Sequence, residues 1–409
     1  MTTLITNIRQ LAGTREDNVL LRGHELANLP VIENAWLLIE DGVIAGYGPM
    51  ENLPAADNTF DATGAMVLPA WCDSHTHLVF AASREEEFVY KLQGMSYADI
   101  AAKGGGILNS AHKLNTMGED ELYRLSWQRL QEVIRLGTGA IEIKSGYGLT
   151  LHGELKMLRV IKRLRETSPI PVKATFLGAH TYPLEFKENH QGYIDLIINQ
   201  MLPAIEKEQL ADYIDVFCEY GFFSAEETET ICEAGKRHGL RPKIHANQLN
   251  LSNGVQAGVK LGAVSVDHLE TMNEDAIQTL AASQTIGTLL PTAAFFLRMG
   301  YQPARRLIES GCAVALASDY NPGSSPSGNM NFVVALSCIQ MKMLPEEAIN
   351  AATINGAFAM ELQDQLGSIT RGKKANLIFT KPVPSLAYLP YSFGSNLVDR
   401  VMINGEWYE

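Results

Sequence analysis

The chain has 409 residues and carries 33 Lys and Arg against 46 Asp and Glu, a formal net charge of −13 at pH 7. Hydrophobic residues make up 46% of it and charged residues 19%, so it can bury a large core, and disordered and fibrous classes are excluded. The acidic balance argues against a general nucleic-acid or anionic-membrane surface, since both need clustered cations. It leaves open an anionic small-molecule substrate, which needs only one local cation.

The opening segment MTTLITNIRQL has no basic region followed by an apolar run, so we expect no secretory signal. The longest apolar stretch, Ile286–Leu297, is interrupted by Pro291 and is too short to span a bilayer. Five cysteines without CxxC spacing indicate free thiols in a cytoplasmic protein and not a disulfide framework or a zinc ribbon.

The first 65 residues have the pattern of β structure, with the apolar runs Ala35–Glu40 and Val43–Tyr47 on either side of a tight turn at Asp41-Gly42. From about Met66, short apolar strands alternate with amphipathic helical patterns such as Glu119–Leu136, which Gly137 would end. We expect eight such strands, near residues 66–70, 139–143, 172–177, 213–217, 241–245, 263–267, 285–290 and 313–318.

Eight strands alternating with helices predict a (β/α)8 TIM barrel of the α/β class over residues 66–365. The tail returns to a β pattern, with expected strands at Asn376–Thr380 and Arg400–Ile403 and a tight turn at Asn404-Gly405. We therefore expect residues 1–65 and 366–409 to pair into one small β-sandwich domain built from both chain termini.

Chemically useful side chains follow most of the predicted barrel strands. In such barrels the loops after the strands converge on the active site, so we expect these side chains to meet there. In chain order they are Asp73, His75, His77, Glu142, Lys144, His180, Glu219, His245, Asp267, His268 and Asp319.

His75 and His77 are two residues apart, so on an extended segment both imidazoles point the same way and can bind one cation. Such a pair alone is also compatible with a polar turn that holds no metal. The further histidine and aspartate at strand ends, His245 and Asp319, favour a metal site. Neutral imidazoles with a carboxylate suit zinc or ferrous iron, and fewer than six protein ligands leave room for water.

These residues resemble the ligand pattern of the amidohydrolase superfamily, in which His-x-His follows strand one, histidines follow strands five and six, and aspartate follows strand eight. The segment Gly367–Leu377 resembles the junction from barrel to β domain in that superfamily. Members with two metals usually carry a carboxylated lysine after strand four, whereas Cys218 and Glu219 stand there and Lys144 lies on strand two. The resemblance therefore implies one divalent ion per chain, held by His75, His77, His245 and Asp319.

Five segments resemble one branch of that superfamily, which opens an imidazolone ring in histidine degradation. They are Ser83–Phe88, Ala102–Ile107, Glu142–Leu149, Leu177–His180 and Ser318–Ser324. One departure is Gln248, because some members carry a glutamate three residues after the strand-five histidine. A carboxamide cannot accept a proton at neutral pH, so we expect Gln248 to orient the ring and not to act as a general base.

Arg84 has two interpretations: it forms a bidentate ion pair with a substrate carboxylate, or it is a solvated charge in the loop beside Glu85–Glu87. His180 is either a hydrogen-bond donor to substrate or a structural histidine. Tyr147, in a turn between two glycines, is either aimed into the barrel mouth or a partly buried loop aromatic. Glu142 and Lys144 lie on one face of the same strand, where an ion pair between them is a sufficient explanation, and we assign them no chemistry.

The remaining expected substrate contacts are Tyr97, on a glycine-rich loop over the barrel mouth, and Asn321, Gly323 and Ser324 after strand eight. The resemblance implies metal-dependent hydrolysis of a cyclic amide, with His268 stabilising the developing oxyanion and Asp319 carrying the proton from water to the leaving nitrogen. There are two alternatives. The first is a deaminase of a related heterocycle that uses the same metal site, and the second is a non-catalytic barrel that serves as an interaction scaffold. We expect the protein to bind a small-molecule substrate and not nucleic acid or a membrane. We also expect it to form a homodimer.

Overall fold

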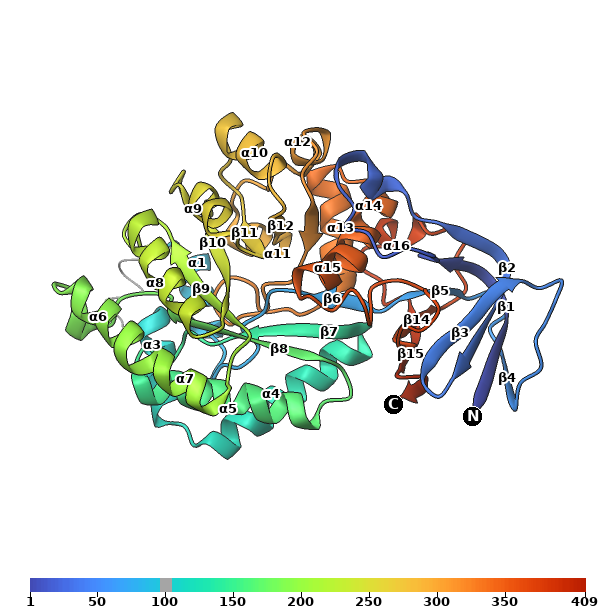
Figure 1. The fold of residues 1–409 in the computed structure, drawn as a ribbon, viewed down its shortest axis with the longest axis horizontal. Helices are drawn as coiled ribbons and strands as arrows, with labels where there is room; N and C mark the ends of the chain where they lie inside the picture. Colours follow the sequence, from blue (N-terminus) through green and yellow to red (C-terminus); the bar gives the residue numbers. More distant parts are fainter. Residues whose placement is uncertain (96–104) are drawn as a thin grey trace.

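The computed structural model describes residues 1–95 and 105–409 (Figure 1). Its strands are β1 Thr2–Ala12, β2 Val31–Glu40, β3 Val43–Pro49, β4 Asn58–Asp61, β5 Met66–Pro69, β6 Trp71–Asp73, β7 Thr138–Lys144, β8 Val172–Ala179, β9 Tyr213–Cys218, β10 Arg241–Ala246, β11 Ser265–His268, β12 Ile286–Leu289, β13 Val314–Leu316, β14 Leu377–Thr380, β15 Val398–Ile403 and β16 Glu406–Tyr408.

The helices alternate with the strands through the middle of the chain. The α-helices are α1 Glu85–Leu92, α3 Ile107–Thr116, α4 Glu119–Arg135, α5 Leu151–Thr167, α6 His190–Leu196, α7 Leu202–Glu208, α8 Ala225–Arg237, α9 Gly254–Leu261, α10 Glu274–Ala281, α11 Pro291–Leu297, α12 Ala304–Glu309, α13 Met330–Met341, α14 Pro345–Ala352, α15 Ile354–Ala359 and α16 Tyr388–Tyr391. Short 3-10 turns η1 Gly23–Ala27 and η2 Leu184–Phe186 and a π-turn η3 Ile197–Met201 complete the described elements.

Strands β6 to β13 form a parallel sheet in sequential order, which confirms the predicted (β/α)8 barrel. The segments after its first and last strands complete the ring, because Asp319 N donates to His75 O and His77 N donates to Tyr320 O. The carboxylate of Asp73 adds two hydrogen bonds across the same seam, accepted from the backbone and the hydroxyl of Ser318 at 3.0 and 2.6 Å. The closing seam of the barrel therefore lies directly beside the His-x-His segment.

The two chain termini form a second, mixed sheet in the order β16-β15-β14-β5-β1-β2-β3, with β4 also paired to β1. The predicted hairpin at Asp41-Gly42 is confirmed, and both residues have the positive φ that its tight turn requires (48° and 83°). The sheet has its own core, with side chains such as Leu37 and Phe379 from its two ends. It lies beside the barrel, and both chain termini lie on the same side of it (Figure 1).

One predicted strand is wrong. Met66–Pro69 was expected to open the barrel, but β5 pairs with β1 and β14 of the terminal sheet, and the first barrel strand is Trp71–Asp73. The apolar run is continuous across both strands, so its pattern does not reveal that the chain changes sheets at Ala70. The sequence-based division placed residues 1–65 and 366–409 in the β domain and residues 66–365 in the barrel. Because β5 pairs with β1 and β14, we propose that the β domain extends to about residue 70 before the barrel begins.

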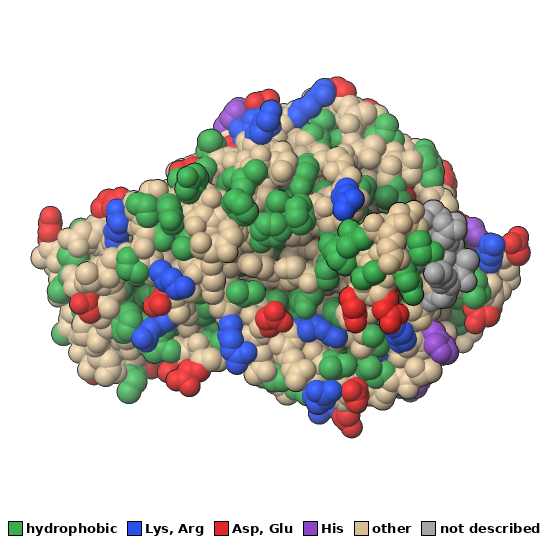
Figure 2. Space-filling model, turned by 180° about the vertical axis from the view of Figure 1, so that it is seen from behind, with side chains coloured by type: hydrophobic (Ala, Val, Ile, Leu, Met, Phe, Trp, Pro, Cys, Tyr) green, Lys and Arg blue, Asp and Glu red, His purple; other side chains and the backbone are tan. Residues whose placement is uncertain are grey.

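The predicted helix Glu119–Leu136 is confirmed as α4, whose buried side chains Leu122, Ser126, Leu130, Val133 and Ile134 follow helical spacing and face the barrel core. Gly137, with φ of 104°, ends it as predicted. Acidic and basic side chains are interspersed on the face seen in Figure 2. Among the described helices, none combines the length and apolarity that crossing a membrane requires.

Candidate active site

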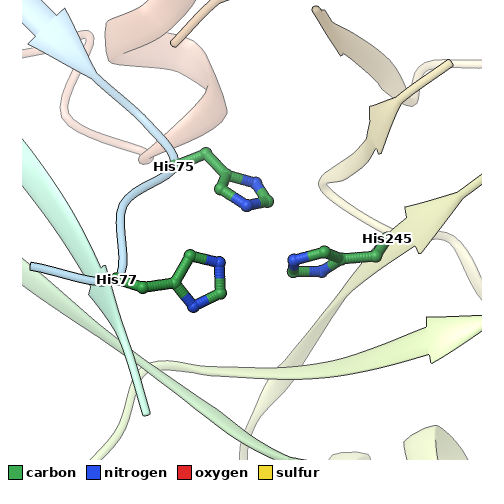
Figure 3. Close-up of side chains that lie close together, drawn as sticks. All are labelled: His75, His77 and His245. Atoms are coloured by element: carbon green, nitrogen blue, oxygen red, sulfur yellow. The ribbon is translucent and has the colours of Figure 1, made fainter. Parts of the chain in front are cut away.

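The first cluster of the site is formed by His75, His77 and His245, whose rings converge at the end of the barrel strands (Figure 3). His75 and His77 lie on the extended segment after β6, and His245 lies near the end of β10. One ligand atom from each lies within 4.8 Å of the others, and His75, His268 and Asp319 form a second such group. Nε2 of His75 and Nε2 of His77 are each 3.5 Å from Oδ1 of Asp319. The structure thus brings together all four predicted metal ligands.

The protonation states of this cluster fit a cation. Burial, reinforced by neighbouring cations and histidines, lowers the pKa of His75 and of His77 well below that of a free histidine, so both rings are neutral. Nδ1 of His75 donates to Oδ2 of Asp267 at 2.7 Å, which leaves a lone pair on Nε2. That buried Nε2 has no hydrogen-bond partner among the described residues. Neutral imidazoles with one carboxylate are ligands that zinc and ferrous iron accept.

His268 lies at the end of β11 in a strained backbone conformation, with φ of 88°. Burial lowers the pKa of its ring, but Glu270, whose Oε1 is 3.4 Å from Nδ1, together with Asp319 and Asp267, raises it above that of a free histidine. His268 is therefore suited to present a proton to a developing negative charge. Glu270 was not recognised in the sequence, because nothing there shows that its carboxylate turns back toward the ring of His268.

Asp319 follows β13 and also has a positive φ, 52°. Burial raises the pKa of its carboxyl to about 6. Oδ2 of Asp319 accepts a hydrogen bond from Oγ of Ser324 at 3.3 Å, while Oδ1 faces the histidines. The carboxylate therefore lies between the metal-binding cluster and the loop after β13.

A pocket of about 430 Å³ opens over this cluster, which is the size of a small-molecule site. Its lining includes most of the predicted catalytic and substrate-binding residues together with several that were not predicted. The lining residues are His77, Arg84, Lys91, Ile107, Tyr147, His180, Phe217, Phe222, His245, Gln248, Leu249, His268, Leu297, Asp319, Asn321, Gly323 and Ser324. Tyr97 lies outside the described residues.

Two cations line the pocket. The Nη2 atom of Arg84 lies 2.6 Å from Oε2 of Glu87, and Nε donates to the same oxygen at 3.0 Å. Its other terminal nitrogen faces Gly323, where an added Cβ would lie only 2.4 Å from Nη1. Lys91, two helical turns along α1, was missed from the sequence because nothing there places that helix at the pocket. The pKa of Lys91 is lowered by burial and then by the charge of Arg84.

His180 and Tyr147 form one wall of the pocket, with ring centroids 5.6 Å apart. Nδ1 of His180 is 3.0 Å from the carbonyl oxygen of Gly146, and burial lowers the pKa of this ring to about 3. A carbonyl can only accept, so Nδ1 carries the proton and Nε2 is a hydrogen-bond acceptor. His180 is thus unsuited to the donor role expected from the sequence. The hydroxyl of Tyr147 has no hydrogen-bond partner within the described part of the chain, and burial raises its pKa.

The side chain of Asn321 is engaged within its own loop. Its amide nitrogen donates to Asp319 O and Ser324 Oγ, and its oxygen accepts from the backbone of Gly323 and Ser324, all at 2.7–2.8 Å. Asn321 therefore shapes the loop that carries the predicted contacts. Gln248 is mostly buried, lines the pocket, and has no side-chain hydrogen bond within the described residues.

Glu219 and Lys144, two further polar residues of the barrel strands, make contacts with groups other than the histidine cluster. Glu219 after β9 accepts hydrogen bonds from the backbone of Leu249 and Asn250 at 2.8 and 3.2 Å and so fixes the loop after β10. Lys144 lies 2.6 Å from Glu142, which confirms the pairing considered from the sequence. Neither is grouped with the histidines as a candidate ligand.

Comparison with known proteins gives a consistent relationship over the whole chain. The model of the amidohydrolase family matches residues 66–408. The chain is 59% identical over 409 residues to an imidazolonepropionase of Flavobacterium johnsoniae and 56% identical to one of Christiangramia forsetii, with 99% of this chain and 100% of each relative covered. An imidazolonepropionase of Thermoanaerobacter pseudethanolicus is 41% identical, with 98% of this chain and 96% of the relative covered.

Solved structures of similar fold are far more distant in sequence. A triazine hydrolase variant superimposes with a TM-score of 0.74 at 16% identity, covering 99% of this chain and 94% of its own. The E. coli guanine deaminase gives 0.73 at 14% identity, covering 100% and 99%. An adenosine deaminase from Xanthomonas campestris with bound zinc gives 0.69 at 18% identity, covering 99% and 92%. At these identities the likeness concerns the fold alone.

Proposed function

The chain belongs to the amidohydrolase family and, within it, to the imidazolonepropionases, and on that premise we propose that it opens the ring of 4-imidazolone-5-propanoate by hydrolysis to N-formimidoyl-L-glutamate in histidine degradation. The observation that carries the proposal is a buried cluster of histidines and Asp319 that opens into a pocket with Arg84 in its wall. A deaminase reaction, the main alternative from the sequence, is favoured only by structures that share the fold at 14–18% identity.

One divalent ion, zinc or iron, is the cofactor that this donor set fits, and His75, His77, His245 and Asp319 are the residues that would hold it. When bound, such an ion supplies Lewis acidity that activates water and polarises the ring carbonyl. The orphaned lone pair of His75 Nε2 and the neutral state of His75 and His77 support this assignment.

His268 and Asp319 carry the proton chemistry in this proposal. His268, whose ring pKa is raised by Glu270, donates a hydrogen bond to the oxygen that becomes negative as the ring carbonyl is attacked. Asp319 takes a proton from the attacking water and returns it to the ring nitrogen that leaves. Gln248 cannot share that role, because an amide does not accept a proton near pH 7, and it orients the ring by hydrogen bonding.

Substrate recognition divides between the two ends of the pocket. Arg84 binds the propionate, and Lys91 adds the net positive charge, since the charge of Arg84 is already offset by Glu87. His180 accepts a hydrogen bond from a ring N–H, and Tyr147 closes the wall beside it. The loop of Asn321, Gly323 and Ser324 presents polar groups toward substrate and product. Tyr97, outside the described residues, stays a proposed substrate contact.

The proposal is tested by incubating metal-loaded protein with freshly prepared imidazolonepropionate. We expect the ultraviolet absorbance of the ring to fall, with formation of N-formimidoyl-L-glutamate and no release of ammonia. Unchanged imidazolonepropionate, together with release of one equivalent of ammonia from an amino-substituted nitrogen heterocycle offered in its place, would establish the deaminase instead.

We further propose that the enzyme acts in the cytoplasm as a homodimer. Its five cysteines are all free thiols, four of them buried, which supports a reducing compartment. Gel filtration with light scattering measures the oligomeric state, and a monomer at micromolar concentration would contradict the proposed homodimer.

A further inference from the structure

Beneath the metal-binding histidines, the barrel interior holds five charged side chains that solvent does not reach. They come from four of the eight barrel strands and have no exposed side-chain surface. They are Glu142 and Lys144 on β7, Asp215 on β9, Lys243 on β10 and Asp267 on β11. Buried charges of this kind are costly unless each is paired, so their arrangement requires an explanation.

Two of the carboxylates stand directly behind two of the histidines. Oδ2 of Asp267 accepts from Nδ1 of His75 at 2.7 Å, and Oδ2 of Asp215 lies 2.9 Å from Nδ1 of His245. Oδ1 of Asp215 also accepts from the backbone nitrogen of His245 at 3.1 Å. A carboxylate behind a histidine fixes the tautomer and the orientation of the ring, and thereby the direction of the other nitrogen.

Lys144 is the group that both carboxylates share. Its Nζ lies 2.9 Å from Oδ2 of Asp215 and 3.6 Å from Oδ2 of Asp267, the same oxygens that face the two histidines, and 2.6 Å from Oε1 of Glu142. Burial opposes its charge, but the three carboxylates raise the pKa of Lys144 above that of a free lysine, so the ammonium stays charged.

The second buried lysine makes different contacts. Nζ of Lys243 pairs with Oε2 of Glu142 and donates to the carbonyl oxygens of Ser74 and Ala359 at 3.1 and 3.2 Å. No ion pair joins Lys243 to Asp215 or Asp267 within the described residues. Without Lys144, the carboxylates behind His75 and His245 would repel each other with no cation between them.

We propose that Lys144 is a positioning residue of the metal centre, which holds Asp215 and Asp267 in the orientation that directs His75 and His245 at one ion. The inference rests on the metal site of the proposed function and adds a residue behind it. It also explains why the lysine on this strand is an ion-pair partner of carboxylates and not itself a ligand.

The test compares Lys144→Met with Lys243→Met, since each removes one buried ammonium from the same cluster and only the first contacts both carboxylates. Zinc affinity is measured by competition with a chromophoric chelator, and the free energy of unfolding of the metal-free proteins is measured in urea. We expect Lys144→Met to bind zinc about 10–100-fold more weakly than wild type. Lys243→Met should lose stability yet keep its affinity within about threefold. Equal loss of affinity in both variants would overturn the proposal, because it would show a general effect of buried charge.

The ligand field gives a second readout that stability alone does not move. The visible absorption spectrum of the cobalt-loaded protein reports ligand geometry, so we expect it to change in Lys144→Met and to match wild type in Lys243→Met. If Lys144→Met does not fold, Lys144→Gln, which keeps a polar end without the charge, takes its place. Wild-type affinity and spectrum in Lys144→Gln would overturn the proposal.

A double-variant cycle tests the route of the effect. In an Asp215→Asn background, Lys144→Gln should weaken zinc binding by a clearly smaller factor than it does in wild type, because one of its two carboxylate partners has lost its charge. Full additivity of the two losses would contradict action through Asp215. Failure of wild type itself to bind either zinc or ferrous iron would refute the metal site of the proposed function, whereas tight wild-type binding with an unaffected Lys144 variant refutes this inference alone.

Discussion

Nδ1 of His180 donates a hydrogen bond to the carbonyl oxygen of Gly146, 3.0 Å away, at the wall of the pocket. This contact determines which ring nitrogen of His180 is protonated, and so makes Nε2 an acceptor for a substrate N–H. Gly146 itself has φ of 110°, and a Cβ there would lie 2.9 Å from Nδ1 of His180 and from the carbonyl oxygen of Leu177. Only glycine fits this position without displacing the histidine.

Gly146→Ala is therefore expected to lower kcat/KM by about tenfold or more, because loss of one oriented hydrogen bond costs about 1–3 kcal/mol. Zinc content should stay at the wild-type value, since the ligands are untouched. Gly239→Ala is the matched control, because Gly239 has φ of 79° and open space around its Cβ position. It should lose stability with unchanged kinetics, and an equal kinetic loss in both variants would show that backbone strain alone is responsible.

Arg84→Ala should reduce kcat/KM for the propionate substrate by about tenfold or more, since a desolvated ion pair with the carboxylate contributes about 2–5 kcal/mol. Steady-state kinetics with an analogue that lacks the carboxylate provides the comparison, because little should be lost there. Arg124→Ala is the control, as Arg124 is an exposed residue that pairs with Glu121 on the surface of α4. Comparable losses on both substrates would mean that Arg84 organises α1 through Glu87 and does not bind the carboxylate.

Gln248 separates ring orientation from proton transfer. Gln248→Glu retains an acceptor oxygen and should keep appreciable activity, whereas Gln248→Ala should lose more, about 1–3 kcal/mol in transition-state stabilisation. His268→Ala and Asp319→Asn should lose on the order of 10²–10⁴-fold in kcat, because they remove oxyanion stabilisation and proton transfer. The rates are compared at equal metal content. A Gln248→Ala variant as impaired as Asp319→Asn would show that the proton passes through a water held by Gln248.

Lys373 in the terminal domain predicts a pH-dependent stability. Burial lowers the pKa of its ammonium to about 8 from the value of 10.5 in the unfolded chain. Between pH 8 and 10.5 the unfolded chain binds more protons at this residue than the folded chain does. The free energy of unfolding therefore rises with pH in this range. Below pH 8 the lysine is charged in both states, and the full cost of burying that charge destabilises the fold. Urea unfolding at pH 7.5 and 9.5 gives the free energy of unfolding of wild type and of Lys373→Met. The stability of wild type relative to the variant should be greater at pH 9.5 than at pH 7.5. A difference that is constant or that falls with pH contradicts this.

The sequence predicted the barrel and the site at its mouth because the relevant signals are local. Strand periodicity located seven of the eight barrel strands, and polar side chains directly after apolar strands, such as His245 and Asp319, located the site. Asp41-Gly42 and Gly137 were assigned correctly because positive φ favours those residue types. The strand near 66–70 was misplaced, since the chain changes sheets within one apolar run.

The features of the site that could not be predicted from the sequence are contacts between residues on different strands and helices. Asp215 and Asp267 are visible as single acids inside apolar strands, but no spacing shows that each stands behind a histidine from another segment. The acceptor state of His180 follows from one carbonyl oxygen, and Lys91 reaches the pocket only through the placement of α1.

Turnover in ¹⁸O-labelled water, with the products analysed by mass spectrometry, tests the central claim most directly. Hydrolytic ring opening predicts that N-formimidoyl-L-glutamate carries one labelled oxygen in the carboxylate formed from the ring carbonyl, and that no ammonia is released. Recovery of the substrate with its ring intact, or an open-chain product whose new carboxylate carries no label, would contradict hydrolytic ring opening by this enzyme.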